Sequence, residues 1–77
     1  MAPKIEDGDI IVVSPKLEAR NGDICVVRVS DEDTVKRIKI EDHVVYLIPL
    51  NPDFEPMAVK KRDVAFLWRV VKVIKNL

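Results

Sequence analysis

The chain has 77 residues, with 13 Lys and Arg side chains against 13 Asp and Glu side chains, so its formal net charge at pH 7 is zero. Because no net field recruits nucleic acid or an anionic membrane, the composition excludes a purely electrostatic binder of either. Hydrophobic residues make up 48% of the chain, which predicts one globular domain over residues 1–77. No apolar run approaches the roughly 18 residues of a membrane span and no signal peptide is present, so we expect a cytoplasmic protein without membrane contact.

The first half of the chain alternates tight turns with β-branched runs. Asp7-Gly8-Asp9 and Asn21-Gly22-Asp23 are turn sequences, because glycine and asparagine adopt positive φ at low cost. Each is followed by a run of apolar, mostly β-branched residues, which is typical of a strand. A polar turn at 31–33 and another at 41–43 flank a third predicted strand. The strands predicted in this half cover residues 10–13, 24–27, 34–40 and 44–49.

The second half continues the pattern. Residues 50–56 contain two prolines and an aromatic residue, which indicates an ordered loop. A short strand is predicted over 57–59 and a long one over 64–74, whose valines and isoleucine favour strand over helix. Short strands without a convincing helix predict an all-β, compact, barrel-like fold with mostly antiparallel pairing.

The single cysteine and the single histidine limit the available chemistry. Cys25 has no partner for a disulfide and lies in an apolar run, where we expect a small buried hydrophobe. His43 would need carboxylates alone to complete a zinc site. We therefore expect no metal, no cofactor and no small-molecule ligand.

Lys36 is the residue whose position is hardest to explain as ordinary packing. Side chains alternate across a strand, so Lys36 shares a face with Thr34, Ile38 and Ile40, whereas the opposite face is mostly charged. Desolvation disfavours a charged ammonium, and a neutral amine is a competent general base for activating a serine. On pattern alone, the alternative in which Lys36 extends its ammonium to water is favoured.

A general base also needs a nucleophile, and the chain offers poor candidates. Ser14 and Ser30 lie at strand ends, where serine usually bonds to the local backbone. Thr34 is two residues from Lys36 on the same face, so we expect it to orient the amine rather than attack a substrate.

Several stretches together resemble one known family. Residues 1–9 look like the Ser-Met-x-Pro-x-Ile-x-Asp-Gly-Asp signature of the LexA-like (S24) peptidases without its first residue. Further stretches resemble the family's second turn and strand, its catalytic lysine segment, its proline-rich segment and its last strand, at residues 21–28, 34–39, 47–56 and 69–74. The family comprises self-cleaving transcriptional repressors and their relatives, with an all-β fold related to the signal peptidases.

The resemblance assigns roles to individual residues. It implies that Lys36 is the general base of a Ser-Lys dyad and that Met1 follows the nucleophilic serine directly. It implies that Pro3 and the Asp7-Gly8-Asp9 turn hold the nucleophile loop in place. The serine would precede Met1, so we expect this chain by itself to be inactive. A boundary trimmed one residue late is favoured over a natural start at Met1.

The leading functional interpretation is the C-terminal regulatory domain of a LexA-like or phage-type repressor. Such a domain would dimerise and cleave itself in the presence of a RecA filament, and would reach DNA only through a missing N-terminal domain. In the last strand Phe66, Trp68 and Val70 share one face and are the candidate dimer element, although burial of both faces within the monomer is equally favoured. The alternatives are an error-prone-polymerase accessory protein, a signal-peptidase-like enzyme and a non-catalytic β-barrel interaction module.

Overall fold

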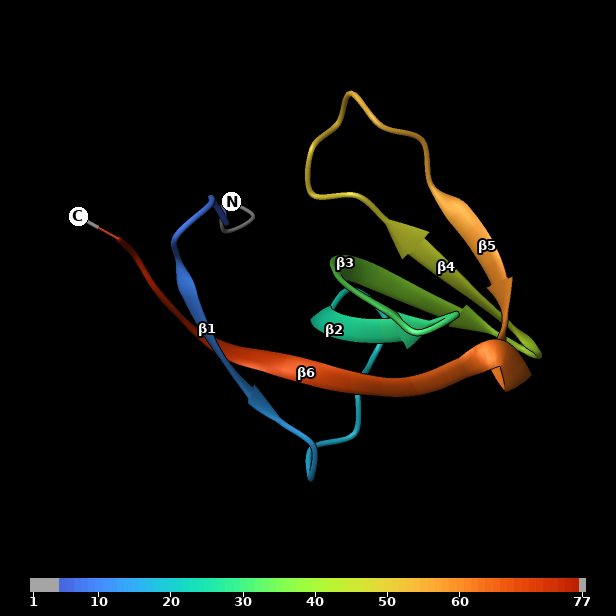
Figure 1. Ribbon diagram of the computed structural model, residues 1–77. Helices are drawn as coiled ribbons and strands as arrows, with labels where there is room; N and C mark the ends of the chain where they lie inside the picture. The colour runs from blue at the N-terminus through green and yellow to red at the C-terminus, as the bar shows by residue number, and fades with distance from the viewer. Residues whose placement is uncertain (1–4, 77) are drawn as a thin grey trace.

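The computed structural model describes residues 5–76, which form six strands and one short 3-10 helix (Figure 1). Met1 and Pro3 lie outside the described residues. The predicted strands are all observed, with ends that differ by a few residues. The elements in chain order are β1 (Ile10–Ser14), β2 (Ile24–Val29), β3 (Glu32–Glu41), β4 (Val44–Ile48), β5 (Met57–Lys60), η1 (Lys61–Asp63) and β6 (Val64–Ile74).

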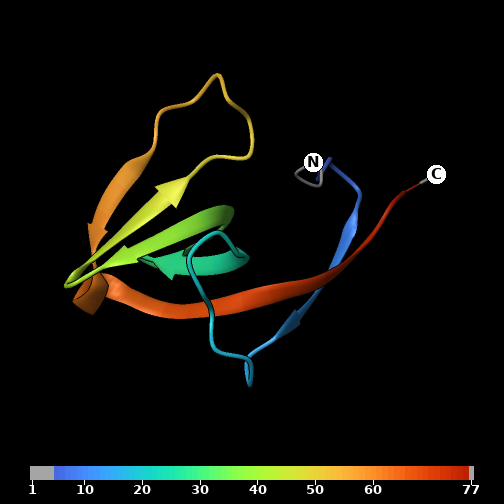
Figure 2. The same ribbon diagram turned by 180° about the vertical axis from the view of Figure 1, so that it is seen from behind.

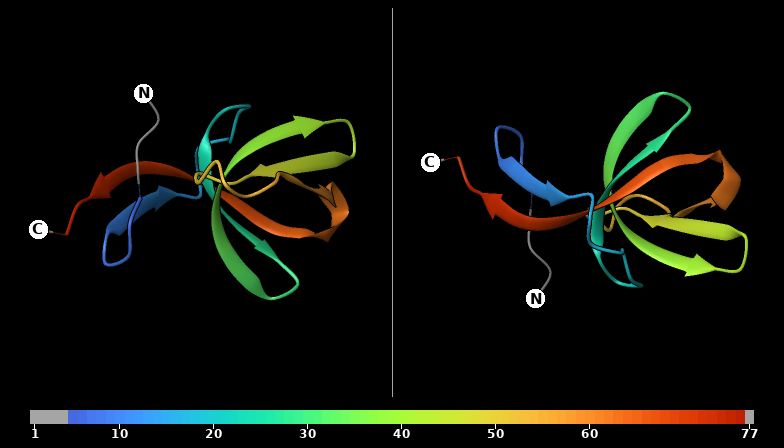
Figure 3. Two further views of the ribbon diagram at one scale, coloured as in Figure 1. Left: turned by 90° about the horizontal axis from the view of Figure 1, so that it is seen from above. Right: turned by 90° about the horizontal axis from the view of Figure 1, so that it is seen from below.

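The six strands form one antiparallel sheet in the order β1-β6-β2-β3-β4-β5. The predicted all-β fold is therefore confirmed. The predicted barrel-like closure is wrong, because the edge strands β1 and β5 do not pair with each other. β1 pairs only with the second half of β6, and this two-stranded ribbon projects away from the other strands (Figure 3). A barrel needs its first and last strands to pair, and here they diverge.

β6 serves two partners along its length. Its first half pairs with β2 and its second half pairs with β1, and Arg69 lies opposite both Cys25 and Ser14. A bulge at Val71 interrupts the pairing with β1. At the bulge Val13 lies opposite Val70 and Val12 lies opposite Lys72, so Val71 is the extra residue. A bulge bends its strand and increases the local twist, which lets β6 leave the β2 side of the sheet and follow β1. The start of β1 and the end of β6 consequently lie side by side (Figures 1 and 2).

The turns follow from the residues that tolerate positive φ. The β2–β3 hairpin turns at Ser30 and Asp31, whose φ angles are 52° and 62°, as a two-residue type I′ turn requires. This turn begins one residue earlier than the predicted polar turn, since Val29 already pairs with Glu32. Gly22 has φ 92° in a turn closed by hydrogen bonds between its neighbours on either side.

The core lies on one face of β2, β3 and β4. Its buried side chains come from alternate positions of these strands: Cys25, Val27, Ile38, Val45 and Leu47. The prediction that the Cys25 side chain is buried is confirmed. Ile38 has no exposed surface, whereas the side chain of Lys39, its neighbour on the opposite face, is 54% exposed. The two faces of β3 therefore differ as alternation predicts.

Candidate functional site

Lys36 lies on the core face of β3. It is half-buried and pairs across the sheet with the buried Cys25 of β2, two positions before Ile38 on the same strand. The strand places it there because alternate residues point to the same face, and the turn at Ser30 and Asp31 fixes the register. Lys36 is thus a cationic side chain on the apolar side of the sheet.

A cavity of about 370 Å³ opens on this face beside Lys36. Its size is within the range of sites that hold a small ligand or a short stretch of peptide. Most of its lining is apolar and comes from the strands around β3, with Lys36, Thr34 and Glu32 on one wall. The lining residues are Val29, Ser30, Glu32, Thr34, Lys36, Leu47, Met57 and Val59.

The Lys36 ammonium has no partner within the part of the chain that the structure describes. No hydrogen bond or ion pair joins it to another described residue, whereas Lys39 on the opposite face has its Nζ 2.9 Å from Glu41 Oε1. A group that enters the cavity can therefore contact the Lys36 side chain without first displacing an ion pair. A lysine amine acts as a general base toward a hydroxyl when it is neutral.

Among residues 5–76, no hydroxyl is placed as a nucleophile for Lys36. Ser14 lies in the same cross-strand row as Lys36. The row runs from Ser14 on β1 through Arg69 on β6 and Cys25 on β2 to Lys36 on β3. Three strand spacings separate Ser14 from Lys36, or about 14 Å along the sheet.

The other two aliphatic hydroxyls are no better placed, and Tyr46 lies opposite Lys39, on the other face of the sheet from Lys36. Ser30 is in the β2–β3 turn, and the four residue steps from Glu32 to Lys36 alone add about 13 Å along β3. Thr34 lies next to Lys36 on the same face and shares its cavity, without a hydrogen bond to it. None of the hydroxyls in residues 5–76 is therefore placed next to the Lys36 amine as a nucleophile.

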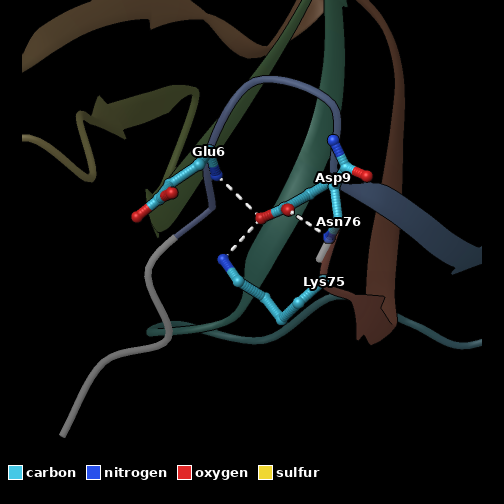
Figure 4. Close-up of polar contacts among 4 residues, drawn as sticks. All are labelled: Glu6, Asp9, Lys75 and Asn76. Carbon is cyan, nitrogen blue, oxygen red and sulfur yellow. Dashed lines mark hydrogen bonds and ion pairs between the residues drawn. The ribbon is translucent and has the colours of Figure 1, made fainter.

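The turn formed by Asp7, Gly8 and Asp9 is anchored to the far end of the chain (Figure 4). The Asp9 carboxylate accepts hydrogen bonds from the Glu6 amide at 2.9 Å, the Asn76 amide at 3.0 Å and the Lys75 ammonium at 2.5 Å. The hydrogen bond from Lys75, followed by those from the two backbone amides, lowers the pKa of Asp9 to about 2. The Asp9 side chain is only 2% exposed, so these partners almost completely cover its carboxylate.

The outer face of β6 carries an aromatic cluster. Phe66 and Trp68 stack with ring centroids 4.1 Å apart, and the Arg28 guanidinium lies 5.1 Å from the Phe66 centroid. Asp33 holds Arg28 there through two hydrogen bonds and raises its pKa. Trp68 remains 37% exposed, so burial of both faces of β6 within the monomer is wrong for this face. Val70 is half-buried on the same face.

Two features of the structure were not predicted from the sequence. The contacts of Lys75 and Asn76 with Asp9 join residues 66 and 67 positions apart, and no local pattern signals them. A cleft at the other end of the sheet is lined by His43, Val44 and residues 60–62, where three consecutive basic side chains gave the only signal. Within residues 5–76 there is no cluster of potential metal ligands and no helix long and apolar enough to cross a membrane.

A lysine with a free amine on the core face of an all-β sheet, beside an apolar cavity, fits a peptidase that uses lysine as its base. Residues 1–71 match the Peptidase S24-like family, and the chain belongs to this family. Over 74 residues it is 53% identical to the LexA repressor of Methylococcus capsulatus and 42% identical to the LexA repressor of Edwardsiella ictaluri. Both comparisons include 94% of this chain and 37% of the relative, so the chain spans little more than a third of those proteins. The resemblance to LexA-like peptidases is thereby confirmed.

Proposed function

We propose that the chain is the regulatory domain of a LexA-like or phage-type repressor, with a role in both dimerisation and self-cleavage. In this proposal Lys36 is the general base and the nucleophile is the serine that the family pattern places directly before Met1. The amine takes the proton from the serine hydroxyl, and the serine oxygen attacks a peptide carbonyl of the same protein. Residues 1–77 supply only the base, so we expect no cleavage by them alone.

The observation that carries this proposal is the position of Lys36. Its amine has no partner among the described residues and faces an apolar cavity of about 370 Å³. If the only role of Lys36 were to keep the protein soluble, an exposed position such as that of Lys39 would serve without any cost in stability. Placing an unpaired cation on the core face costs stability, and such costs are typical of functional sites.

The aromatic face of β6 supports the dimerisation part of the proposal. Phe66 and Trp68 form a stacked pair in which Phe66 is half-buried and Trp68 is exposed, with the half-buried Val70 further along the same face. Aromatic residues are enriched at the centres of protein interfaces, and a homodimer would cover this face by two-fold symmetry. Contact with DNA would come through a separate N-terminal domain, and a RecA filament would stimulate cleavage in the cytoplasm.

The test of the proposed function is a fusion protein that contains the whole chain. The upstream portion of the Methylococcus capsulatus LexA repressor, ending in its family serine, is joined to Met1. The fusion is incubated at neutral and alkaline pH with and without RecA filaments, and the fragments are separated by gel electrophoresis. We expect cleavage that accelerates as pH rises, because a neutral amine is needed, and that is lost in Lys36→Met.

Lys39→Met is the matched control, since Lys39 is on the same strand and the opposite face. It should cleave at the unsubstituted rate. Cleavage of the Lys36→Met fusion at an undiminished rate would overturn the role of Lys36. A fusion that folds and dimerises without cleaving would instead favour the non-cleaving relatives of the family, such as the polymerase accessory proteins.

A further inference from the structure

Asp9 is the point at which the two ends of the described chain are joined. Its carboxylate binds the Glu6 amide within its own turn, and the Lys75 ammonium and Asn76 amide beyond the end of β6 (Figure 4). The side chain is 2% exposed, so these three donors take the place of water around the carboxylate. Charge-assisted hydrogen bonds of this kind are the strongest in proteins and fix the geometry of the groups they join.

The turn before β1 is fitted to the same anchor from a second side. Gly8 has φ 88°, and a Cβ at this position would lie 2.7 Å from Nδ2 of Asn76. The Asn76 side chain therefore packs directly against the backbone of the turn. The Asp9 amide also donates to the Glu6 carbonyl at 3.1 Å, which closes the turn on itself. Backbone, side chain and charge all hold this turn against the end of β6.

β6 is also the strand from which the position of Lys36 derives. Arg69 of β6 lies opposite Cys25, and Cys25 lies opposite Lys36, so the base is two strands away from β6 in the same sheet. The turn at Asp9 is bound to the end of β6, six residues beyond Arg69. β6 thus contacts the turn through which the chain enters β1 and is linked, through β2, to the strand that carries the base.

We propose that Asp9, Lys75 and Asn76 form a latch that positions the nucleophile segment relative to Lys36. This inference rests on the proposed function, in which the serine precedes Met1 and so lies six positions before Glu6. The turn held by the latch is the part of the described chain that leads from that segment into β1. Asp9 and its partners are positioning residues, because they act through the segment and do not touch the reacting atoms. The C-terminal end of the chain then becomes part of the machinery of self-cleavage.

Two substitutions break the latch in different ways, and each has a matched control. Asp9→Asn keeps the shape of the side chain but sets an amide N–H₂ against one of the three donors. Its matched control is Asp53→Asn, which makes the same change in the β4–β5 loop. Gly8→Ala places a methyl group against Asn76. Gly22→Ala imposes the same backbone strain, at φ 92°, in a turn where nothing lies within 4 Å of the added Cβ.

The measurement is the rate of self-cleavage per folded molecule in the fusion protein described above, with the folded fraction determined by circular dichroism. We expect Asp9→Asn and Gly8→Ala to lower this rate by about tenfold or more, since small misplacements of reacting groups have effects of this size. The pH at which the rate is half-maximal should stay unchanged, because the base itself is not altered. Lys75→Gln should lower the rate in the same way, and Lys75→Arg should restore it by retaining a cation.

Equal rates per folded molecule for Asp9→Asn, Gly8→Ala and their two controls would overturn the latch and leave Asp9 a purely structural residue. A shifted pH midpoint would also overturn it, since Asp9 would then act on the base electrostatically. An unsubstituted fusion that folds without cleaving would refute the proposed function, and the positioning role with it. The contact itself can be tested separately in the 77-residue chain. If it forms, the Glu6 and Asn76 amides should exchange hydrogen more slowly in the unsubstituted chain than in the Asp9→Asn variant.

Discussion

Replacing Lys36 with methionine should make the domain more stable. The substitution keeps the length of an unbranched side chain and removes an ammonium that has no partner among residues 5–76. The side chain lies between the buried Cys25 and the apolar lining of the cavity, which includes Leu47 and Val59. A methionine there can remain among these neighbours, because its end has no need of water.

The size of the gain follows from the area that the new side chain covers. If its end removes about 40 Å² of apolar surface from water, the gain at 25 cal/mol per Å² is about 1 kcal/mol. Against a total stability of about 4–11 kcal/mol for a domain of this length, this is a measurable fraction. It corresponds to a rise in Tm of about 4–8 °C.

The assay is urea unfolding of the 77-residue chain followed by circular dichroism, with Lys39→Met as the control. Lys39 is 54% exposed and paired with Glu41, so its substitution removes a surface ion pair and should change stability by at most about 1 kcal/mol in the unfavourable direction. The two variants are thus expected to move the urea midpoint in opposite directions. A Lys36→Met midpoint at or below that of Lys39→Met would refute the conclusion that Lys36 faces the core at a cost.

Other substitutions and conditions test separate parts of the structure. Ile38→Ala should destabilise the domain by about 2–5 kcal/mol in urea unfolding, because Ile38 is fully covered by the core; a loss below that range would contradict its central position. Burial first, and then Asp23, raises the pKa of the Cys25 thiol to about 11, so a thiol reagent at pH 8 should label the chain only after unfolding, and rapid labelling of the folded chain would be inconsistent with this. The pKa of Asp9 falls from 3.8 to about 2 on folding, so its contribution to stability is present above pH 3.8 and is lost as pH falls toward 2. Asp9→Asn should therefore flatten the fall in urea midpoint between pH 4 and pH 2, and an unchanged slope would count against the anchor.

The strands could be predicted from the sequence because their signals are local. The turns at Gly8 and Gly22 need positive φ, and both glycines have it in the structure. The β-branched runs after them fit a pleated surface. The period of two along residues 34–40 also placed Lys36 on the face of Ile38, because strand alternation depends only on sequence spacing. These features required no knowledge of distant parts of the chain.

Closure of the sheet and the Asp9 anchor could not be predicted in the same way. Whether β1 pairs with β5 depends on how far β6 twists away from β2, and the bulge that sets this twist has no local signature. Asp9 reads as a turn residue, and its bond to the Glu6 amide is local, but Lys75 is 66 positions away. Partners at that separation are determined by the whole topology. The resemblance implied that the turn at Asp9 holds the nucleophile loop, but nothing in the sequence indicated that the turn is bound to Lys75 and Asn76.

The bulge at Val71 also sets the phase of the last residues of β6. Because side chains alternate, one extra residue moves every later side chain to the opposite face. If β6 kept Val71 but paired with β1 without the bulge, Val12 would lie opposite Val71, and every later residue of β6 would shift by one position along β1. The side chain of Lys75 would then lie on the opposite face from Asp9. A single residue in the middle of β6 thus decides whether the two ends of the chain can meet.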